Sequence, residues 1–278
     1  MNINEARIQW ENAAPGWAKW EDVLSQGVSL VTETMLKMAG IIPGHRVLDL
    51  ASGAGSQTLL AAERVGPGGF VIANDISQTM LNHVDQNAKY KGFSNVSTLL
   101  GAVQELNIEL NSFDSAICRF ALMLFANPGV ALSNVYKVLK PKGKIGVIVF
   151  STPEENPFFV RPMQILLRHA GKTPPIGAPG LFSLGNSEVL EKLFAGSGFT
   201  NIEINKQSVL LQLPPAKDSM TMIQEAFGAY RAVISDCQED VQNAAWAEVL
   251  DYLQSLDTGK GIEAPSEVLV ASAQKPGF

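Results

Sequence analysis

The sequence predicts an α/β protein built on an open, doubly wound and mostly parallel sheet. Strand-like and helix-like segments alternate through the middle of the chain, as repeated βα units do. A glycine-rich turn follows the first of these strands, and an acidic residue ends the second. Five strands joined by helices within about 100 residues make this architecture the natural expectation.

Apolar runs and helix-boundary residues place the elements of this core. Ser77 suits the N-cap of the second helix, and Pro128 suits the first turn of the third, which ends in lysines. The predicted strands are 46–50, 69–75, 96–103, 115–122 and 143–150. The predicted helices are 56–66, 78–92 and 128–140.

The alternation stops after Phe150, where many prolines and glycines surround one short helix at 160–169. A helix at 187–199, a strand at 200–213, two helices within 218–256 and a last strand at 266–275 are expected next. They complete a Rossmann-like sheet of seven strands, in which the last strand is a candidate for the antiparallel direction. We expect a single domain over residues 1–278. Its predicted parts are an N-terminal helical cap (1–35), a binding core (40–150) and a helical lid or insertion on the acceptor side (151–186 and 215–260).

Composition narrows the classes of function. The chain has 278 residues, with 27 acidic and 21 basic side chains and a net charge of −6, which disfavours nucleic acid as a partner. Neither a membrane span nor a secretory signal is expected. The two cysteines, Cys118 and Cys237, have no metal-type spacing, so we expect no metal and a reduced, cytoplasmic setting. The oligomeric state stays open, a homodimer included.

The turn "ASGAGS" lies at the carboxyl end of the first strand, where open α/β sheets bind ligands. Gly53 and Gly55 can adopt backbone angles closed to other residues and can expose N–H groups to a ligand. Asp75 ends the second strand about 20 residues after Gly55, the spacing at which a carboxylate accepts both hydroxyls of a bound ribose. Together they predict a nucleoside site.

The identity of the nucleoside follows from two further positions. Thr58 stands where a dinucleotide-binding turn has its third glycine. Asp49 lies inside the first strand, where it can orient the turn or reach a cationic group of the ligand, and where it would repel a phosphate. The site therefore suits a positively charged nucleoside without phosphate. S-adenosyl-L-methionine fits this description.

Four motifs in order carry a resemblance to a known family. They are "VLDLASGAGSQT" (47–58), "NDISQTML" (74–81), "FDSAICRFALMLFANP" (113–128) and "VLKPKGKIGV" (138–147). Residues 40–150 are thereby similar to the class I S-adenosylmethionine-dependent methyltransferases, in their ubiquinone/menaquinone-type (methyltransferase 11-like) branch. The resemblance implies a transferase that uses S-adenosyl-L-methionine as its cofactor.

The same resemblance implies a role for each matching position. Asp75 would bind the ribose, flanked by Ile76 and Met80, while the third strand would end at the adenine. The positions implied for the methionine end are the backbone of Ala51, Ser52 and Gly53, then Cys118 and Arg119. One departure concerns adenine. The family's aspartate after the third strand is replaced by Ala102, so the contact would pass to the Val103 amide or to Gln104.

Catalysis by displacement at a sulfonium requires alignment, exclusion of water and, for some acceptors, a base. Among the histidines, His169 is our candidate base, because it ends the helix in the proline-rich insertion; a surface role is the alternative. Trp20, with Trp17 on one helix face, either anchors that helix or covers the cofactor, since aromatic faces attract a sulfonium.

Phe158, Phe159, Met163 and Phe182 indicate an apolar or aromatic acceptor, or else belong to the core. The leading hypothesis is a methyltransferase acting on oxygen, carbon or nitrogen of a small molecule. Two alternatives stay open. A non-catalytic protein that keeps the nucleoside site is one, and an NAD-dependent oxidoreductase, disfavoured by Asp49 and Thr58, is the other.

Overall fold

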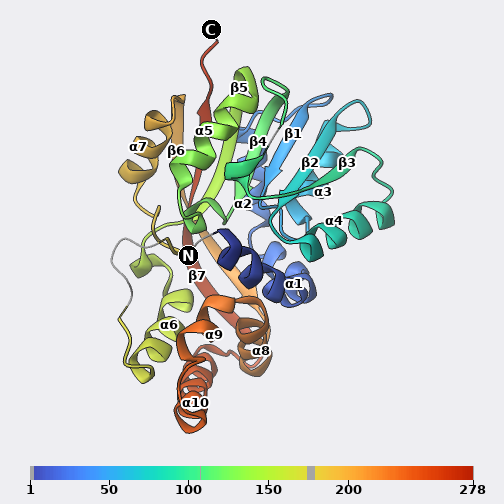
Figure 1. Ribbon diagram of the computed structural model, residues 1–278. Helices are drawn as coiled ribbons and strands as arrows, with labels where there is room; N and C mark the ends of the chain where they lie inside the picture. Colours follow the sequence, from blue (N-terminus) through green and yellow to red (C-terminus); the bar gives the residue numbers. More distant parts are fainter. Residues whose placement is uncertain (1–2, 107, 174–178, 278) are drawn as a thin grey trace.

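The computed structural model describes residues 3–106, 108–173 and 179–277. Its centre is one seven-stranded sheet in the order β3-β2-β1-β4-β5-β7-β6, in which β1 to β5 are parallel and β7 is antiparallel to both neighbours (Figure 1). The strands are β1 (Arg46–Leu50), β2 (Phe70–Asp75), β3 (Val96–Leu100), β4 (Phe113–Arg119), β5 (Leu139–Phe150), β6 (Thr200–Leu213) and β7 (Ile262–Gln274). The predicted fold class is confirmed. The strand order reverses between β1 and β4, which is the switch point where such sheets bind ligands.

Helices complete the layers. They are α1 (Ile3–Gln26), α2 (Ser29–Met38), α3 (Ser56–Val65), α4 (Gln78–Tyr90), α5 (Pro128–Val138), α6 (Pro157–His169), α7 (Ser187–Gly196), α8 (Ala216–Ala226), α9 (Gly228–Ile234) and α10 (Glu239–Leu256). α3 and α4 pack on the β1–β3 half of the sheet, while α2 and α5 pack on β5. Across the described residues, no helix combines the length and the apolar character that crossing a membrane demands.

Most elements lie where the sequence predicts them, but several of their ends differ. The strand predicted at 115–122 is Phe113–Arg119, the strand predicted from 143 starts at Leu139, and the helix predicted from 160 starts at Pro157. The third strand ends at Leu100, because Gly101 has a φ of +148° and a short 3₁₀ turn starts at Val103. Three helices, α8 to α10, occupy the stretch predicted to hold two, because the chain breaks helical geometry at Phe227 and again before Glu239. The last strand lies between β5 and β6, and it starts at Ile262.

Figure 1 shows the helices that lie at the carboxyl ends of the parallel strands, which are α1, α6, α8, α9 and α10. α1, in dark blue, contacts α4 on one side and α8 and α9 on the other, while α10 packs on α6 and α8. Lys19 Nζ and Trp20 Nε1 of α1 both donate to the carboxylate of Glu225 on α8, at 2.8 and 2.6 Å. α1 is thereby fixed across the edge of the sheet where the ligand site is predicted.

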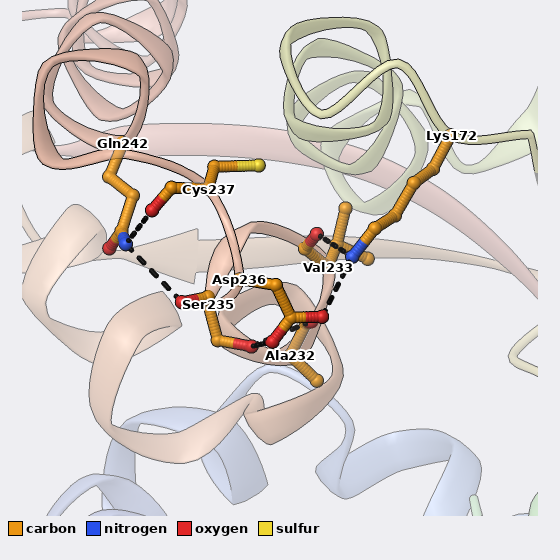
Figure 2. A network of polar contacts seen from close by, with 7 residues as sticks. All are labelled: Lys172, Ala232, Val233, Ser235, Asp236, Cys237 and Gln242. Carbon is orange, nitrogen blue, oxygen red and sulfur yellow. Dashed lines mark hydrogen bonds and ion pairs between the residues drawn. The ribbon is translucent and has the colours of Figure 1, made fainter.

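A polar network joins the chain beyond α6 to the turn between α9 and α10 (Figure 2). Lys172 Nζ donates to the carbonyl oxygen of Val233 at 2.8 Å and pairs with Asp236 at 3.5 Å. Gln242 Nε2 donates to the carbonyl oxygen of Cys237 at 2.8 Å, which holds the start of α10 against the same turn. These contacts make α6, α9 and α10 one helical unit beyond the sheet.

Candidate functional site

The glycine-rich turn after β1 has the geometry of a ligand cradle. Ala51, Gly53 and Gly55 have φ values of +49°, +57° and +100°. The N–H of Ser52 donates to the carbonyl oxygen of Asn74 at 2.9 Å, which ties the turn to the end of β2. A methyl group added at Gly53 would meet no atom within 4 Å, so this part of the turn has open space beside its backbone.

Asp75 lies beside this turn and is almost fully buried. Its carboxylate accepts one hydrogen bond from the N–H of Gly53 and one from the N–H of Ser77, both at 2.9 Å. Burial raises the pKa of Asp75 to about 6, and these backbone hydrogen bonds oppose the shift. Two carboxylate oxygens offer about four acceptor positions, so Asp75 keeps acceptor capacity for two ribose hydroxyls. The residues therefore fit the nucleoside that the sequence implies.

Asp49 is fully buried inside β1 and contacts the first turn of α3. Thr58 Oγ1 donates to its carboxylate at 2.5 Å, and Gln57 Nε2 donates to it at 3.3 Å. Gln57 Nε2 also donates to the carbonyl oxygen of Ser52 at 3.0 Å. The geometry corresponds to the first of the two roles considered for Asp49, which is to orient the turn. Thr58, at the position of the missing third glycine, is its hydrogen-bond partner.

Asp49 should also make the stability of the unliganded protein depend on pH. Burial raises its pKa to about 7, so folding favours its protonated form. The resulting stabilisation is complete below the ordinary aspartate pKa of about 4 and is lost as the pH rises through about 7. We expect Asp49→Asn to reduce the loss of unfolding free energy between pH 5 and pH 8 by about 2–3 kcal/mol.

Urea unfolding at both pH values, with exposed Asp251→Asn as the control, measures this effect. If the wild type and Asp49→Asn lost the same free energy between pH 5 and pH 8, the raised pKa of Asp49 would be refuted.

Arg119 ends β4 and reaches the start of α3. Its Nη1 donates to Thr32 Oγ1 at 3.2 Å, and its Nη2 donates to Ser56 Oγ at 2.5 Å. The backbone N–H of Ser56 donates to Glu21 Oε1 of α1 at 2.8 Å. Burial lowers the pKa of Arg119, and the carboxylates of Glu21 and Asp49 oppose this shift. Arg119 therefore has acidic neighbours within the protein.

The other residues implied for the cofactor differ in how directly they contact the same turn. Met80 is buried and packs with Ala54 of the turn and Ala14 of α1. Ile76 follows Asp75 directly, whereas Ala102 and Val103 are buried beyond the end of β3. Cys118 is fully buried in β4, and burial raises the pKa of its thiol to about 12, so this sulfur stays protonated at neutral pH.

Two predicted residues have their polar contacts elsewhere. Trp20 donates to Glu225 on α8, which supports the anchoring role more than the covering role. His169 is at the far end of α6, about 18 Å along the helix from its start near β5. Its Nε2 lies 2.8 Å from Glu248 of α10, so this histidine joins two outer helices rather than the residues around the turn.

This placement gives a direct test of His169. Polar contacts near the surface, such as this one with Glu248, contribute little to stability, so His169→Ala should change the stability little. We expect it to change turnover by less than about threefold, because its ring is engaged with Glu248 away from the turn. Steady-state kinetics measure the effect. A loss of a hundredfold or more, with the fold intact by circular dichroism, would restore His169 as the base.

A series of aromatic rings connects the ends of β4 and β5 with α1. Phe120 stacks on Phe150 at 4.7 Å between ring centroids, and Phe150 lies 4.6 Å from Phe159. Phe227 lies 6.1 Å from Phe159 and 5.6 Å from Trp17. Phe182 and Phe158 touch this series. Phe158 and Phe159 are buried in the core, and Met163 and Phe182 pack against it, which agrees with the alternative that these residues belong to the core.

Three of these rings, Phe120, Phe150 and Phe227, are absent from the sequence prediction. The sequence offers one indication that Phe120 belongs to the site, because Phe120 directly follows Arg119 at the end of a strand. In the structure its φ is +57°, which is uncommon for an aromatic residue. Phe150 also ends a strand. Phe227 has no local signal, because only the fold brings it to the others.

Comparisons with known sequences agree with this site. A family model described as a methyltransferase domain matches residues 41–170. The ubiquinone/menaquinone biosynthesis C-methyltransferase of Legionella pneumophila (strain Lens) is 34% identical over 146 residues, which are 52% of this chain and 58% of that protein. The corresponding enzyme of Psychromonas ingrahamii is 36% identical over 138 residues, 49% of this chain and 55% of that protein. The matches thus span less than two thirds of these relatives.

Solved structures extend the likeness in fold to most of the chain. The YcgJ protein from Bacillus subtilis has a TM-score of 0.61 at 21% identity and covers 89% of this chain and 99% of its own. Phosphoethanolamine N-methyltransferase 2 from Haemonchus contortus, in complex with S-adenosyl-L-methionine, has a TM-score of 0.54 at 19% identity. The match covers 88% of this chain and 52% of that protein. The [4+2]-cyclase SpnF has a TM-score of 0.56 at 18% identity, with 95% of each chain covered. Shared fold alone therefore leaves the reaction open.

Proposed function

We propose that this protein is a class I methyltransferase that transfers a methyl group from S-adenosyl-L-methionine to a small apolar or aromatic molecule. The match of residues 41–170 to a methyltransferase-domain model and the similarity to ubiquinone/menaquinone biosynthesis C-methyltransferases support this proposal. One observation carries the proposal: the carboxylate of Asp75 lies against the N–H of Gly53 in a turn with open space beside it. A carboxylate and a glycine turn in this relation can hold a nucleoside by its ribose.

The aromatic series supports the choice of acceptor. It begins at Phe120 and Phe150, next to Arg119 at the carboxyl ends of β4 and β5, and it reaches Trp17 on α1. The indole Nε1 of Trp17 is buried and has no hydrogen-bond partner among the described residues. Buried indole N–H groups usually have a partner, so an acceptor oxygen beside these rings would satisfy it. A flat molecule with a carbonyl or hydroxyl group suits this surface.

The chemistry of the nearby side chains narrows the acceptor further. When bound, S-adenosyl-L-methionine supplies an electrophilic methyl group on a sulfonium. Burial raises the pKa of the Cys118 thiol to about 12 and also raises the pKa of the Tyr230 phenol, so neither is a base at neutral pH. The protein then contributes alignment and exclusion of water. A phenol or a quinol gives up its proton more readily than an aliphatic alcohol does, so it is the best match as acceptor.

The remaining proposals concern the setting. The net charge of −6 supports a small-molecule acceptor over a nucleic acid. Two free cysteines support a cytoplasmic location, and a homodimer is the assembly to test by sedimentation. In the domain organisation that we propose, residues 1–35 and the helices beyond the sheet cover one site in a single domain.

Incubation with methyl-labelled S-adenosyl-L-methionine and a panel of phenols, quinols and aliphatic amines tests the function. We expect turnover with a phenol or quinol and none with the amines. Tight binding of S-adenosyl-L-homocysteine with no turnover on any acceptor would favour a non-catalytic protein. Binding of NAD in place of the homocysteine nucleoside would refute the proposal.

A further inference from the structure

Glu21 of α1 is a carboxylate at an unusual place, the first turn of another helix. Its Oε1 accepts a hydrogen bond from the backbone N–H of Ser56 at 2.8 Å. The residue before Ser56 is Gly55, which provides no side-chain cap, so this N–H has no local partner. The free N–H groups and the dipole at the start of a helix favour a negative charge there.

A guanidinium adds to this anion-binding geometry. Arg119 Nη2 donates to Ser56 Oγ at 2.5 Å. Arg119 of β4 and Glu21 of α1 therefore both hydrogen-bond to Ser56, one through its hydroxyl and the other through its N–H. Burial raises the pKa of Glu21, while the hydrogen bond from Ser56 and the charge of Arg119 oppose this shift and favour the carboxylate at this point. The occupant is supplied by α1, which is 35 residues away in sequence.

A second carboxylate of α1 provides a comparison. Glu11 accepts from the N–H and the hydroxyl of Thr79 in the first turn of α4. Glu11 therefore also anchors α1, but among the described residues no arginine hydrogen-bonds to Thr79. Glu21 differs because Arg119 hydrogen-bonds to the same serine, and because Ser56 directly follows the glycine-rich turn that would hold the methionine end of the nucleoside.

We propose that Glu21 occupies the subsite for the amino-acid carboxylate of the nucleoside, formed by the N–H of Ser56 and by Arg119. The inference rests on the proposed function. It adds that the side chain of Glu21 competes with the carboxylate of the bound nucleoside for this subsite. α1 must release the Glu21 contact before an S-adenosyl amino acid binds fully. A nucleoside that lacks the amino-acid carboxylate does not compete with Glu21 and binds without this release.

Titration calorimetry with two nucleosides tests the competition. S-adenosyl-L-homocysteine carries the carboxylate, whereas 5′-methylthioadenosine lacks the whole amino-acid part. We expect Glu21→Gln to raise the affinity for S-adenosyl-L-homocysteine by about fivefold and to leave that for 5′-methylthioadenosine within about twofold. Glutamine keeps the size of the side chain but lacks the charge that Arg119 and the helix start favour.

Glu11→Gln is the matched control, because it loosens a different contact of α1, the one with Thr79, and leaves the subsite intact. It should change the affinities for both nucleosides by the same factor. Equal changes for both nucleosides in Glu21→Gln would overturn the inference and leave Glu21 as an anchor only. A lower affinity for S-adenosyl-L-homocysteine would also overturn it, because Glu21 would then be a ligand of the amino-acid ammonium. If the wild type bound neither nucleoside, the proposed function would fail first, and this inference with it.

Discussion

Alanine at position 75 is expected to lower the affinity for S-adenosyl-L-homocysteine by about 100-fold or more. The variant loses an acceptor for the ribose hydroxyls, and hydrogen bonds to a charged group contribute about 1.5–3 kcal/mol each. It also removes the acceptor that holds the N–H groups of Gly53 and Ser77 at 2.9 Å. The glycine-rich turn therefore loses one of its connections to the end of β2 as well as its contact with the ligand, and keeps the hydrogen bond from Ser52 to Asn74.

Titration calorimetry on Asp75→Ala, Asp75→Asn and His169→Ala separates these contributions. Asparagine keeps one acceptor oxygen and the size of the side chain, so its loss should be intermediate. His169→Ala should bind as the wild type does. Because the pKa of Asp75 is about 6, the affinity of the wild type should also fall as the pH drops below that value. A decrease of less than about threefold in Asp75→Ala would show that the ribose is bound elsewhere.

The sheet and its turn were predictable from local pattern. A buried strand such as Arg46–Leu50 is recognised by its short run of mostly apolar residues. The start of α4 is recognised by Ser77, whose side chain can cap a helix. The ends of β1 and β2 meet at one edge of a parallel sheet, so Gly53 and Asp75 could be placed together from sequence alone. Asp49 gave a choice of two roles, and the contact with Thr58 distinguishes them.

The covering helices were not predictable to the same degree. Nothing in the sequence around Glu21 indicates that it binds Ser56 on a different helix, because the contact depends on where α1 lies. Phe227 reaches the aromatic series for the same reason, since α8 and α9 are placed by packing against α1, α6 and α10. The position of β7 between β5 and β6 is likewise a property of the whole sheet.

Alanine at position 55 is expected to destabilise the protein by about 2–4 kcal/mol. Gly55 has a φ of +100°, where side chains other than glycine are strained by about 1–2 kcal/mol. The added methyl carbon would also lie 2.9 Å from Cγ2 of Val84, a fully buried side chain of α4. Relief requires the turn to move away from α4, and overpacking of this kind costs about 1–3 kcal/mol.

Urea unfolding measures the effect, and Gly92→Ala is the matched control. Gly92 follows α4 with a φ of +75°, and a methyl group there would meet no atom within 4 Å. It therefore reports backbone strain without the clash. If the Val84 contact is the cause, Gly55→Ala should cost more than Gly92→Ala, and adding Val84→Ala should cost less in the Gly55→Ala background than in the wild type. Additive effects in that double variant would assign the whole loss to backbone strain, and the close packing of α4 would then have no part in shaping the turn.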